Sequence, residues 1–238
     1  MKSDTSALTD QQAITTMFDD IAPRYDLLNH LLSFRMDILW RRRLAKIVAK
    51  SHAETVLDVA TGTADLAIRM AKELPEAHLT GIDLSQAMLD IGREKTKRQH
   101  LENRIRLLQA DAQKLPFPNH SFNAVTVAFG VRNYENLADG LREMCRVAKP
   151  GGLIGILEFS LPKAFPIKPL YRLYSKHLIP CIGGMVSKHP GAYRYLPASI
   201  EAFHRDYDLV ALLKELGTSS INTIRLFGGI ASIYVATV

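Results

Sequence analysis

Three aspartates stand where short apolar segments of the sequence end or turn. They are Asp58 in the run 56–60, Asp83 after the run 79–82, and Asp111 after the run 105–110. Any one of them could be a helix cap or a turn residue. If the three runs are neighbouring parallel strands, however, their carboxyl ends open onto one crevice, where the carboxylates face the same ligand. An acid that ends the second strand can accept hydrogen bonds from a ribose diol, so the pattern predicts a site for a ligand that carries a nucleoside.

A turn with a single glycine follows the first of these runs. Thr61-Gly62-Thr63 breaks the apolar run, and residues 64–74 then carry apolar side chains at helical spacing before the second run begins. A dinucleotide fingerprint has three glycines in this turn, so the sequence has no evident seat for a pyrophosphate. The acid-x-x-x-glycine spacing of Asp58 and Gly62 instead resembles motif I of the S-adenosylmethionine-dependent methyltransferases with a Rossmann-like fold. The alternative is an ordinary βαβ unit whose glycine only makes the turn.

The resemblance implies that the cofactor is S-adenosylmethionine and that its product is S-adenosylhomocysteine. Asp83 would then accept hydrogen bonds from both ribose hydroxyls, Asp111 would face the adenine edge, and Asp58 would complement the ammonium of the aminoacyl end. The backbone of the glycine turn would pass close to the same end. The cofactor-binding residues implied in this way are Asp58, Gly62, Thr63, Asp83, Asp111 and Ala112.

The rest of the sequence alternates strands and helices, which predicts an α/β fold with ligands at the carboxyl ends of a mostly parallel sheet. We expect strands at 56–60, 79–82, 105–110, 125–129, 153–159, 221–227 and 231–236, and helices at 13–25, 26–32, 38–50, 64–74, 85–97, 137–147 and 208–216. Pro23 is expected to end the first helix, Ser85 to cap another, and residues 149–152 to form a turn. The last two strands are close enough to pair as an antiparallel hairpin, which predicts the seven-stranded, Rossmann-like sheet of a class I methyltransferase.

Two regions stand outside this rhythm. We expect residues 1–50 to form a helical lid, frayed at its start, on a methyltransferase domain of residues 51–238, the whole being one structural domain. We expect residues 160–200 to form an insertion that covers the substrate, and the prolines in it predict that its helices are short. Six basic residues and one acid between Arg35 and Lys50 indicate either a solvated helix face or attraction to an anionic partner.

Several segments outside motif I resemble one family more closely. Residues 18–29 read FDDIAPRYDLLN, Trp40 and Arg41 follow, and residues 128–133 read AFGVRN. From about residue 18 to the C-terminus the chain resembles the ubiquinone/menaquinone biosynthesis C-methyltransferases. It departs from that family at the glycine turn, where two glycines are replaced, and at Ala128, where some members have a serine that contacts the cofactor. Further matching segments are 146–152, 157–160, 193–196 and 199–200.

That resemblance implies methyl transfer to a ring carbon of a polyprenylated quinol, above all the conversion of demethylmenaquinol to menaquinol. The carbon becomes nucleophilic when a neighbouring hydroxyl loses its proton, so the site must remove that proton or stabilise the phenolate. Arg132 is the expected stabilising group and Asn133 the expected partner of the ring oxygen; alternatively Arg132 pairs with a carboxylate and holds its loop. Tyr25 and Asn29 are expected on a lid over the cofactor, the alternative for Tyr25 being packing between the N-terminal helices.

Two other activities stay open on the residues alone. One is methylation of another small phenolic or lipid substrate, against which the segment 129–133 argues. The other is methylation of RNA, suggested by a net charge of +6; because the chain has no recognisable RNA-binding signature, we expect no nucleic-acid partner. The eight histidines are scattered, so no metal is expected either. The number of subunits, a homodimer included, is left open.

Composition and charge predict a cytoplasmic protein that meets the membrane from one side. The 238 residues are 47% hydrophobic, include no apolar run near the ~20 residues of a membrane span, and start with a polar segment unlike a signal peptide. Between residues 159 and 200 no Asp or Glu occurs, whereas lysines and arginines alternate with aromatic and aliphatic side chains. Such a segment suits peripheral contact with anionic lipid; the alternative is that it only folds over the active site.

Overall fold

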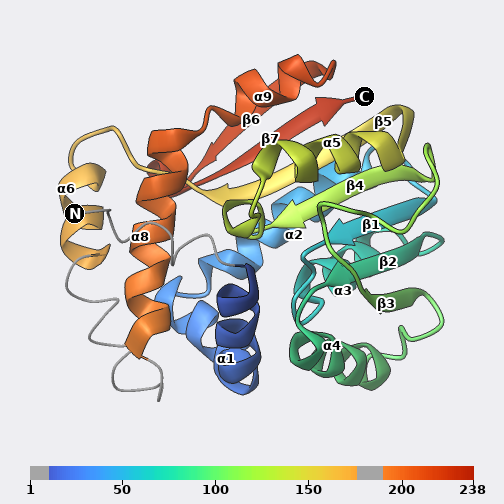
Figure 1. Ribbon diagram of the computed structural model, residues 1–238, viewed down its shortest axis with the longest axis horizontal. Coiled ribbons are helices and arrows are strands. Elements are labelled where there is room, and N and C mark those ends of the chain that lie inside the picture. The colour runs from blue at the N-terminus through green and yellow to red at the C-terminus, as the bar shows by residue number, and fades with distance from the viewer. Residues whose placement is uncertain (1–10, 176–189) are drawn as a thin grey trace.

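The computed structural model describes residues 11–175 and 190–238, which are built around one seven-stranded sheet (Figure 1). The strands lie in the order β3-β2-β1-β4-β5-β7-β6; β7 runs antiparallel to β5 and β6, and the other pairs are parallel. This confirms the predicted α/β class and the C-terminal antiparallel hairpin. The bounds are β1 Thr55–Val59, β2 His78–Asp83, β3 Ile105–Gln109, β4 Phe122–Ala128, β5 Ala148–Phe159, β6 Ser219–Leu226 and β7 Ala231–Thr237.

Helices cover both faces of the sheet because each of them buries an apolar stripe (Figure 1). On one face, α2 (Met36–Ala49), α3 (Asp65–Glu73) and α4 (Gln86–Arg98) share a buried cluster with the strands. On the other face, α5 (Leu137–Val147) and α9 (Leu209–Glu215) share a second cluster. The ligand sites described below lie at one end of this three-layered core.

The N-terminal helix α1 (Gln11–Leu32) is a continuous helix of 22 residues that packs against α4. The expectation that Pro23 ends the first helix and that a second one follows is wrong. A proline inside a helix removes a hydrogen bond and costs about 3 kcal/mol. Burial of Ile14, Ala22 and Leu28 and contact with α4 outweigh this local cost, because most helix stability in a folded protein comes from tertiary packing.

The insertion contains α6 (Ile167–Leu173) and most of α8 (Pro190–Asp206). The expectation of short helices is correct for α6 but wrong for α8, whose 17 residues continue through Pro197. Ile200 and Phe203 are buried, so tertiary packing again stabilises a helix that proline would shorten. The parts of the predicted lid and insertion that lie outside the described residues are 1–10 and 176–189, with Lys176 and Lys188 among them.

Strand β5 begins earlier than the sequence predicts, because the expected turn at residues 149–152 lies inside it. The register between β4 and β5 shifts between Phe122 and Ala124, so the extra residues of β5 form a bulge. Gly151 has a φ of +75° at this point, a conformation that glycine adopts without strain. Residues 149–152 therefore contain the glycine that a turn needs, but the pairing of β5 with β4 keeps them in the sheet.

We expect Leu44→Ala to destabilise the whole protein, whereas Leu39→Ala on the same helix should not. Leu44 is fully buried, and its Cδ1 would lie 2.9 Å from a Cβ added to Gly155 of β5, so the side chain packs directly on the sheet. Its truncation should cost about 2–5 kcal/mol of unfolding free energy. Leu39 is 53% exposed, and its truncation should cost about 0.5 kcal/mol or less. Urea unfolding measures both values, and equal small effects would show that α2 lies outside the cooperative core.

Candidate functional site

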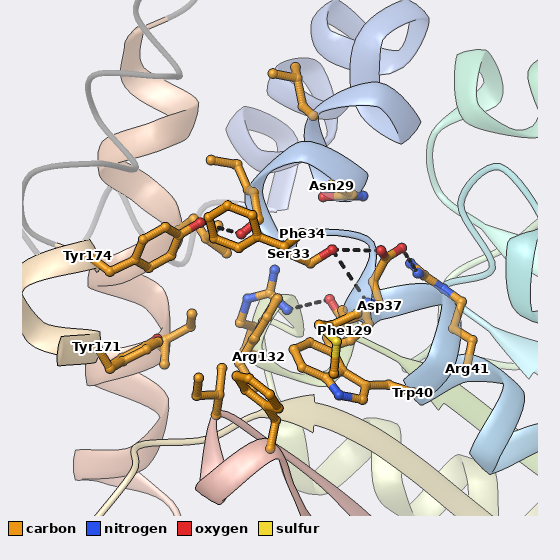
Figure 2. Close-up of a pocket in the computed structure, with 18 of the residues that line it drawn as sticks. Asn29, Ser33, Phe34, Asp37, Trp40, Arg41, Phe129, Arg132, Tyr171 and Tyr174 are labelled. Carbon is orange, nitrogen blue, oxygen red and sulfur yellow. Dashed lines mark hydrogen bonds and ion pairs between the residues drawn. The ribbon is translucent and has the colours of Figure 1, made fainter. Parts of the chain in front are cut away.

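Two cavities meet at the carboxyl edge of the sheet. One is a cleft of about 80 Å³ beside the turn after β1 and the end of β2. The other is a largely apolar cavity of about 680 Å³ whose walls come from α1, α2, α6 and α8 (Figure 2). Phe18, Tyr25 and Phe129 line both of them. A small polar cleft therefore adjoins a large apolar cavity, and three aromatic rings form the border.

The carboxylate of Asp83 connects the turn after β1 with the loop after β2. It accepts hydrogen bonds from the backbone N–H of Gly62 at 2.8 Å and of Ser85 at 2.9 Å. Burial raises the pKa of Asp83, and these N–H groups act against the rise. Gly62 has a φ of +56°, which favours glycine at the turn. Both residues line the cleft, and a carboxylate has about four acceptor positions, so Asp83 can also accept hydrogen bonds from a ligand diol.

Asp58 lies beneath the turn and lines neither cavity. Its side chain is 1% exposed and accepts hydrogen bonds from the hydroxyls of Thr61 at 2.7 Å and Thr126 at 2.8 Å. Burial raises the pKa of Asp58 to about 6, although both hydroxyls act in the opposite direction. In this structure Asp58 joins β1, the turn and β4, and its contact with an ammonium group stays a prediction.

Thr63 and Asp111 also use their side chains within the protein. Thr63 is 2% exposed, and its hydroxyl donates to Asp26 of α1 at 2.6 Å. Asp111 accepts a hydrogen bond from the N–H of Gln113 at 2.9 Å. Of the predicted pair after β3, it is Ala112 that lines the cleft. Among the predicted cofactor residues, the structure therefore brings Gly62, Asp83, Ala112 and Tyr25 together around the cleft.

Helix α1 covers this cleft. Gln11, Ile14 and Thr15 lie in its wall, and Asp19 accepts a hydrogen bond from the hydroxyl of Ser85 at 2.5 Å. Small-molecule sites usually enclose about 300–1,000 Å³. The acceptors and the glycine turn suit a nucleoside joined to an amino acid, but 80 Å³ is too small for one. The cleft is therefore narrower in this structure than the cofactor that its residues suit.

Arg132 lies in the wall of the larger cavity, on the short turn η2 (Val131–Asn133) after β4 (Figure 2). Its Nη1 donates to Glu158 at 2.8 Å and to the carbonyl of Phe129, and its Cζ lies 5.5 Å from the centre of the Phe159 ring. Burial opposes the charge, but Glu158 raises the pKa of Arg132 overall. The guanidinium is thus paired with a carboxylate, and it also lines the cavity.

Asn133 lies on the cleft side of the same turn. Its Oδ1 accepts a hydrogen bond at 2.8 Å from the hydroxyl of Tyr195, which belongs to α8 and lines the larger cavity. The two side chains therefore connect the cavities. Tyr25 borders both cavities from α1, where its ring meets Phe18 edge to face with centres 6.0 Å apart.

The larger cavity also contains a buried polar cluster that sequence reasoning missed (Figure 2). Asp37 accepts hydrogen bonds from Arg41 at 2.5 Å and from the hydroxyl of Ser33 at 2.6 Å, and it lies 3.0 Å from Nδ1 of His30. Asp37 is 2% and Arg41 7% exposed. The interpretation of the basic segment as a solvated face is therefore wrong for Arg41. The sequence did contain a signal for this ion pair: Asp37 and Arg41 are four residues apart, which places them on the same face of a helix.

Known proteins are similar to this chain in both sequence and fold. The model of the ubiE/COQ5 methyltransferase family matches residues 6–238. A demethylmenaquinone methyltransferase of Bacteroides fragilis is 42% identical over 226 residues, which are 95% of this chain and 92% of that protein. A ubiquinone/menaquinone biosynthesis C-methyltransferase, UbiE, of Geobacter sulfurreducens is 42% identical over 224 residues, 94% and 87% of the two chains. A SAM-dependent methyltransferase from Aquifex aeolicus shares the fold, with a TM-score of 0.53 at 19% identity over 77% of this chain and 81% of that one.

We expect Asp58→Asn to change the pH dependence of stability. The pKa of Asp58 is about 6 in the folded chain against an ordinary 3.8, so the folded state binds the proton more tightly. The tighter proton binding stabilises the folded state fully below about pH 4. As the pH rises through 6 this contribution to the free energy of unfolding, on the order of 3 kcal/mol, is lost. Asparagine does not titrate. Urea unfolding between pH 4.5 and 7.5 should therefore show a smaller loss in the variant than in the wild type, and equal losses would refute the assignment.

Proposed function

The chain belongs to the ubiE/COQ5 methyltransferase family, and we propose that it methylates a ring carbon of a polyprenylated quinol. It is an S-adenosylmethionine-dependent C-methyltransferase of the type that acts in menaquinone and ubiquinone biosynthesis. The reaction we propose is demethylmenaquinol to menaquinol; a benzoquinol ring is the alternative, because one relative is named for ubiquinone as well. The observation that carries the proposal is the large apolar cavity that borders the cofactor cleft at Phe18, Tyr25 and Phe129.

The larger cavity suits a ring with a long hydrocarbon tail. Its volume is about 680 Å³, and much of its wall is aliphatic or aromatic, including Leu28, Met36, Leu170 and Ile200. Because such a wall is about as apolar as lipid, a prenyl chain passes from a membrane into the cavity at little cost. The quinol ring would then lie at the aromatic border, where the cavity meets the cleft.

The residues at the border fit the chemistry of ring methylation. When bound, S-adenosylmethionine supplies an electrophilic methyl group. A ring carbon becomes a nucleophile when the neighbouring hydroxyl loses its proton, and Arg132, held by Glu158, stabilises the resulting phenolate. A guanidinium keeps its own proton at neutral pH, so Arg132 is not the base. Water accepts the proton of the hydroxyl and, after methyl transfer, the proton of the methylated ring carbon, and S-adenosylhomocysteine leaves. Asn133, oriented by Tyr195, binds a ring oxygen, and the apolar wall excludes water and strengthens both interactions.

The test is a reaction of the purified protein with S-adenosylmethionine and a short-tailed demethylmenaquinol, followed by mass spectrometry of the quinone. Transfer of one methyl group to the ring carbon is expected, and methylation of an oxygen or of a simple phenol alone would contradict the proposal. Arg132→Gln should lower turnover by about 10²–10³-fold, since it removes an electrostatic stabiliser of the phenolate. The affinity for S-adenosylhomocysteine, measured by calorimetry, should be unchanged.

The control for this variant concerns Glu158, which is 1% exposed. Loss of its cationic partner leaves a buried charge that can itself destabilise the protein. The double variant Arg132→Gln/Glu158→Gln removes both charges and should fold normally while its turnover stays as low as that of Arg132→Gln. Normal turnover in either folded variant would exclude the proposed role of Arg132.

We also propose that the mouth of the larger cavity rests on a lipid surface. Several side chains around it are exposed although they are large and apolar: Phe34 is 68% exposed, Leu170 63% and Phe227 63%, and all three line the cavity. Phe165 is 87% and Leu173 62% exposed on and beside α6. Within residues 11–175 and 190–238, no helix has the length and apolar character of a membrane span. The arrangement supports a peripheral contact through which a quinol enters the cavity directly from lipid.

Liposome flotation tests this contact with two variants. Phe165→Ser/Leu170→Ser/Leu173→Ser should abolish most of the binding, because it removes the exposed apolar side chains. Lys163→Gln/Lys168→Gln/Arg172→Gln should weaken binding to anionic vesicles at low salt, since each exposed cation contributes about 1 kcal/mol near such a surface. The charge-matched control changes three exposed lysines on other elements, Lys72, Lys114 and Lys214, to glutamine and should bind like the wild type. Equal flotation of all four proteins would exclude a membrane role for α6.

A further inference from the structure

Arg41 is a buried cation for which the proposed reaction provides no role so far. The side chain is 7% exposed, yet it lines the larger cavity. Its Cζ lies 5.2 Å from the centre of the Phe129 ring, and Phe129 also lines the cofactor cleft. Arg41 therefore stands at the border between the two cavities, in van der Waals reach of the ring that separates them.

The position of Arg41 is set by a dedicated group of partners. Asp37 accepts a hydrogen bond from Nη1, and Asp37 is in turn held by the hydroxyl of Ser33 and by His30. Among the described residues, Asp37 is the only acceptor for this guanidinium, and no nitrogen of Arg41 is buried without a partner. A guanidinium has five N–H donors. The remaining donors of a side chain that lines the cavity are therefore available to a ligand.

We propose that Arg41 binds the α-carboxylate of S-adenosylmethionine. The inference rests on the proposed function, since it requires that the cleft holds this cofactor. With the ribose at Asp83 and the methyl group directed into the larger cavity, the aminoacyl chain has to pass the border formed by Tyr25 and Phe129. An arginine there can bind a carboxylate through two parallel N–H groups, a geometry that lysine lacks.

The electrostatic neighbours of Arg41 agree with this position. Burial opposes its charge, but Asp65 at the start of α3, Asp37 and Tyr25 raise the pKa of Arg41. Arg41 also acts on the pKa of Asp58, beneath the glycine turn. The cation is thus electrostatically coupled to the turn at which the aminoacyl end is expected.

The second arginine of the cavity wall lies on the substrate side. Arg132 stands over the ring of Phe159, which lines the larger cavity but not the cleft. Arg41 stands over the ring of Phe129, which lines both the larger cavity and the cleft. We therefore assign Arg132 to the quinol and Arg41 to the cofactor.

The experiment is a binding cycle that pairs a change in the protein with a change in the ligand. Calorimetry measures S-adenosylhomocysteine, which has the α-carboxylate, and 5′-methylthioadenosine, which lacks the whole aminoacyl group, on the wild type and on Arg41→Gln. The variant should bind S-adenosylhomocysteine about 10–100-fold more weakly, the range for loss of a hydrogen bond to a charged group. Its affinity for methylthioadenosine should change less than twofold. Arg41→Lys should restore only part of the loss.

Two control variants separate the possible outcomes. Arg42→Gln makes the same change one residue along α2, on a side chain that is 51% exposed, and should leave both affinities unaltered. Because Arg41→Gln leaves Asp37 buried without its cation, Asp37→Asn/Arg41→Gln removes both charges and should show the same ligand selectivity in a protein with normal thermal unfolding. An equal loss for both ligands would mean that Arg41 only supports the fold.

An unchanged affinity for S-adenosylhomocysteine in a folded variant with reduced turnover would move Arg41 to the quinol and overturn the inference. Failure of the wild type to bind S-adenosylhomocysteine at all would instead refute the proposed function. The two failures are therefore distinguishable in one set of titrations.

Discussion

The cofactor cleft depends on one carboxylate that holds two loops together. Asp83 ends β2 and accepts N–H groups from Gly62, after β1, and from Ser85, before α4. A buried carboxylate is costly unless hydrogen bonds satisfy it, and two backbone donors do so here while fixing the distance between the loops. Because Asp83 also lines the cleft, the residue that connects the two loops is also the one expected to bind the ribose.

The apolar cavity imposes the opposite constraint on its cations. A guanidinium in such surroundings loses its hydration, so it persists only with a carboxylate partner. Glu158 provides that partner for Arg132, and Asp37 provides it for Arg41. Both arginines line the larger cavity while keeping these partners. The proposed division between a quinol side and a cofactor side depends on where the two carboxylates hold them.

Helix α1 forms part of the wall of both cavities. Its N-terminal half covers the cleft, and its later residues, with Tyr25 and Leu28 among them, form a wall of the larger cavity. Asp26 ties this helix to the hydroxyl of Thr63 and to Lys95 of α4. Both ligand sites therefore share one helix, whose position is fixed by these contacts.

The sequence by itself determined the parts of the site that arise within one βαβ unit. The period of the apolar residues and the spacing of Gly62 and Asp83 are local, so they predicted the sheet, the turn and the ribose acid, and the family resemblance added Arg132. Only the tertiary structure decided which carboxylate neutralises Arg132. Arg132 and Glu158 are 26 residues apart, and no local pattern encodes such a contact. For the same reason the helix through Pro23 was misjudged, since its stability comes from packing against distant elements.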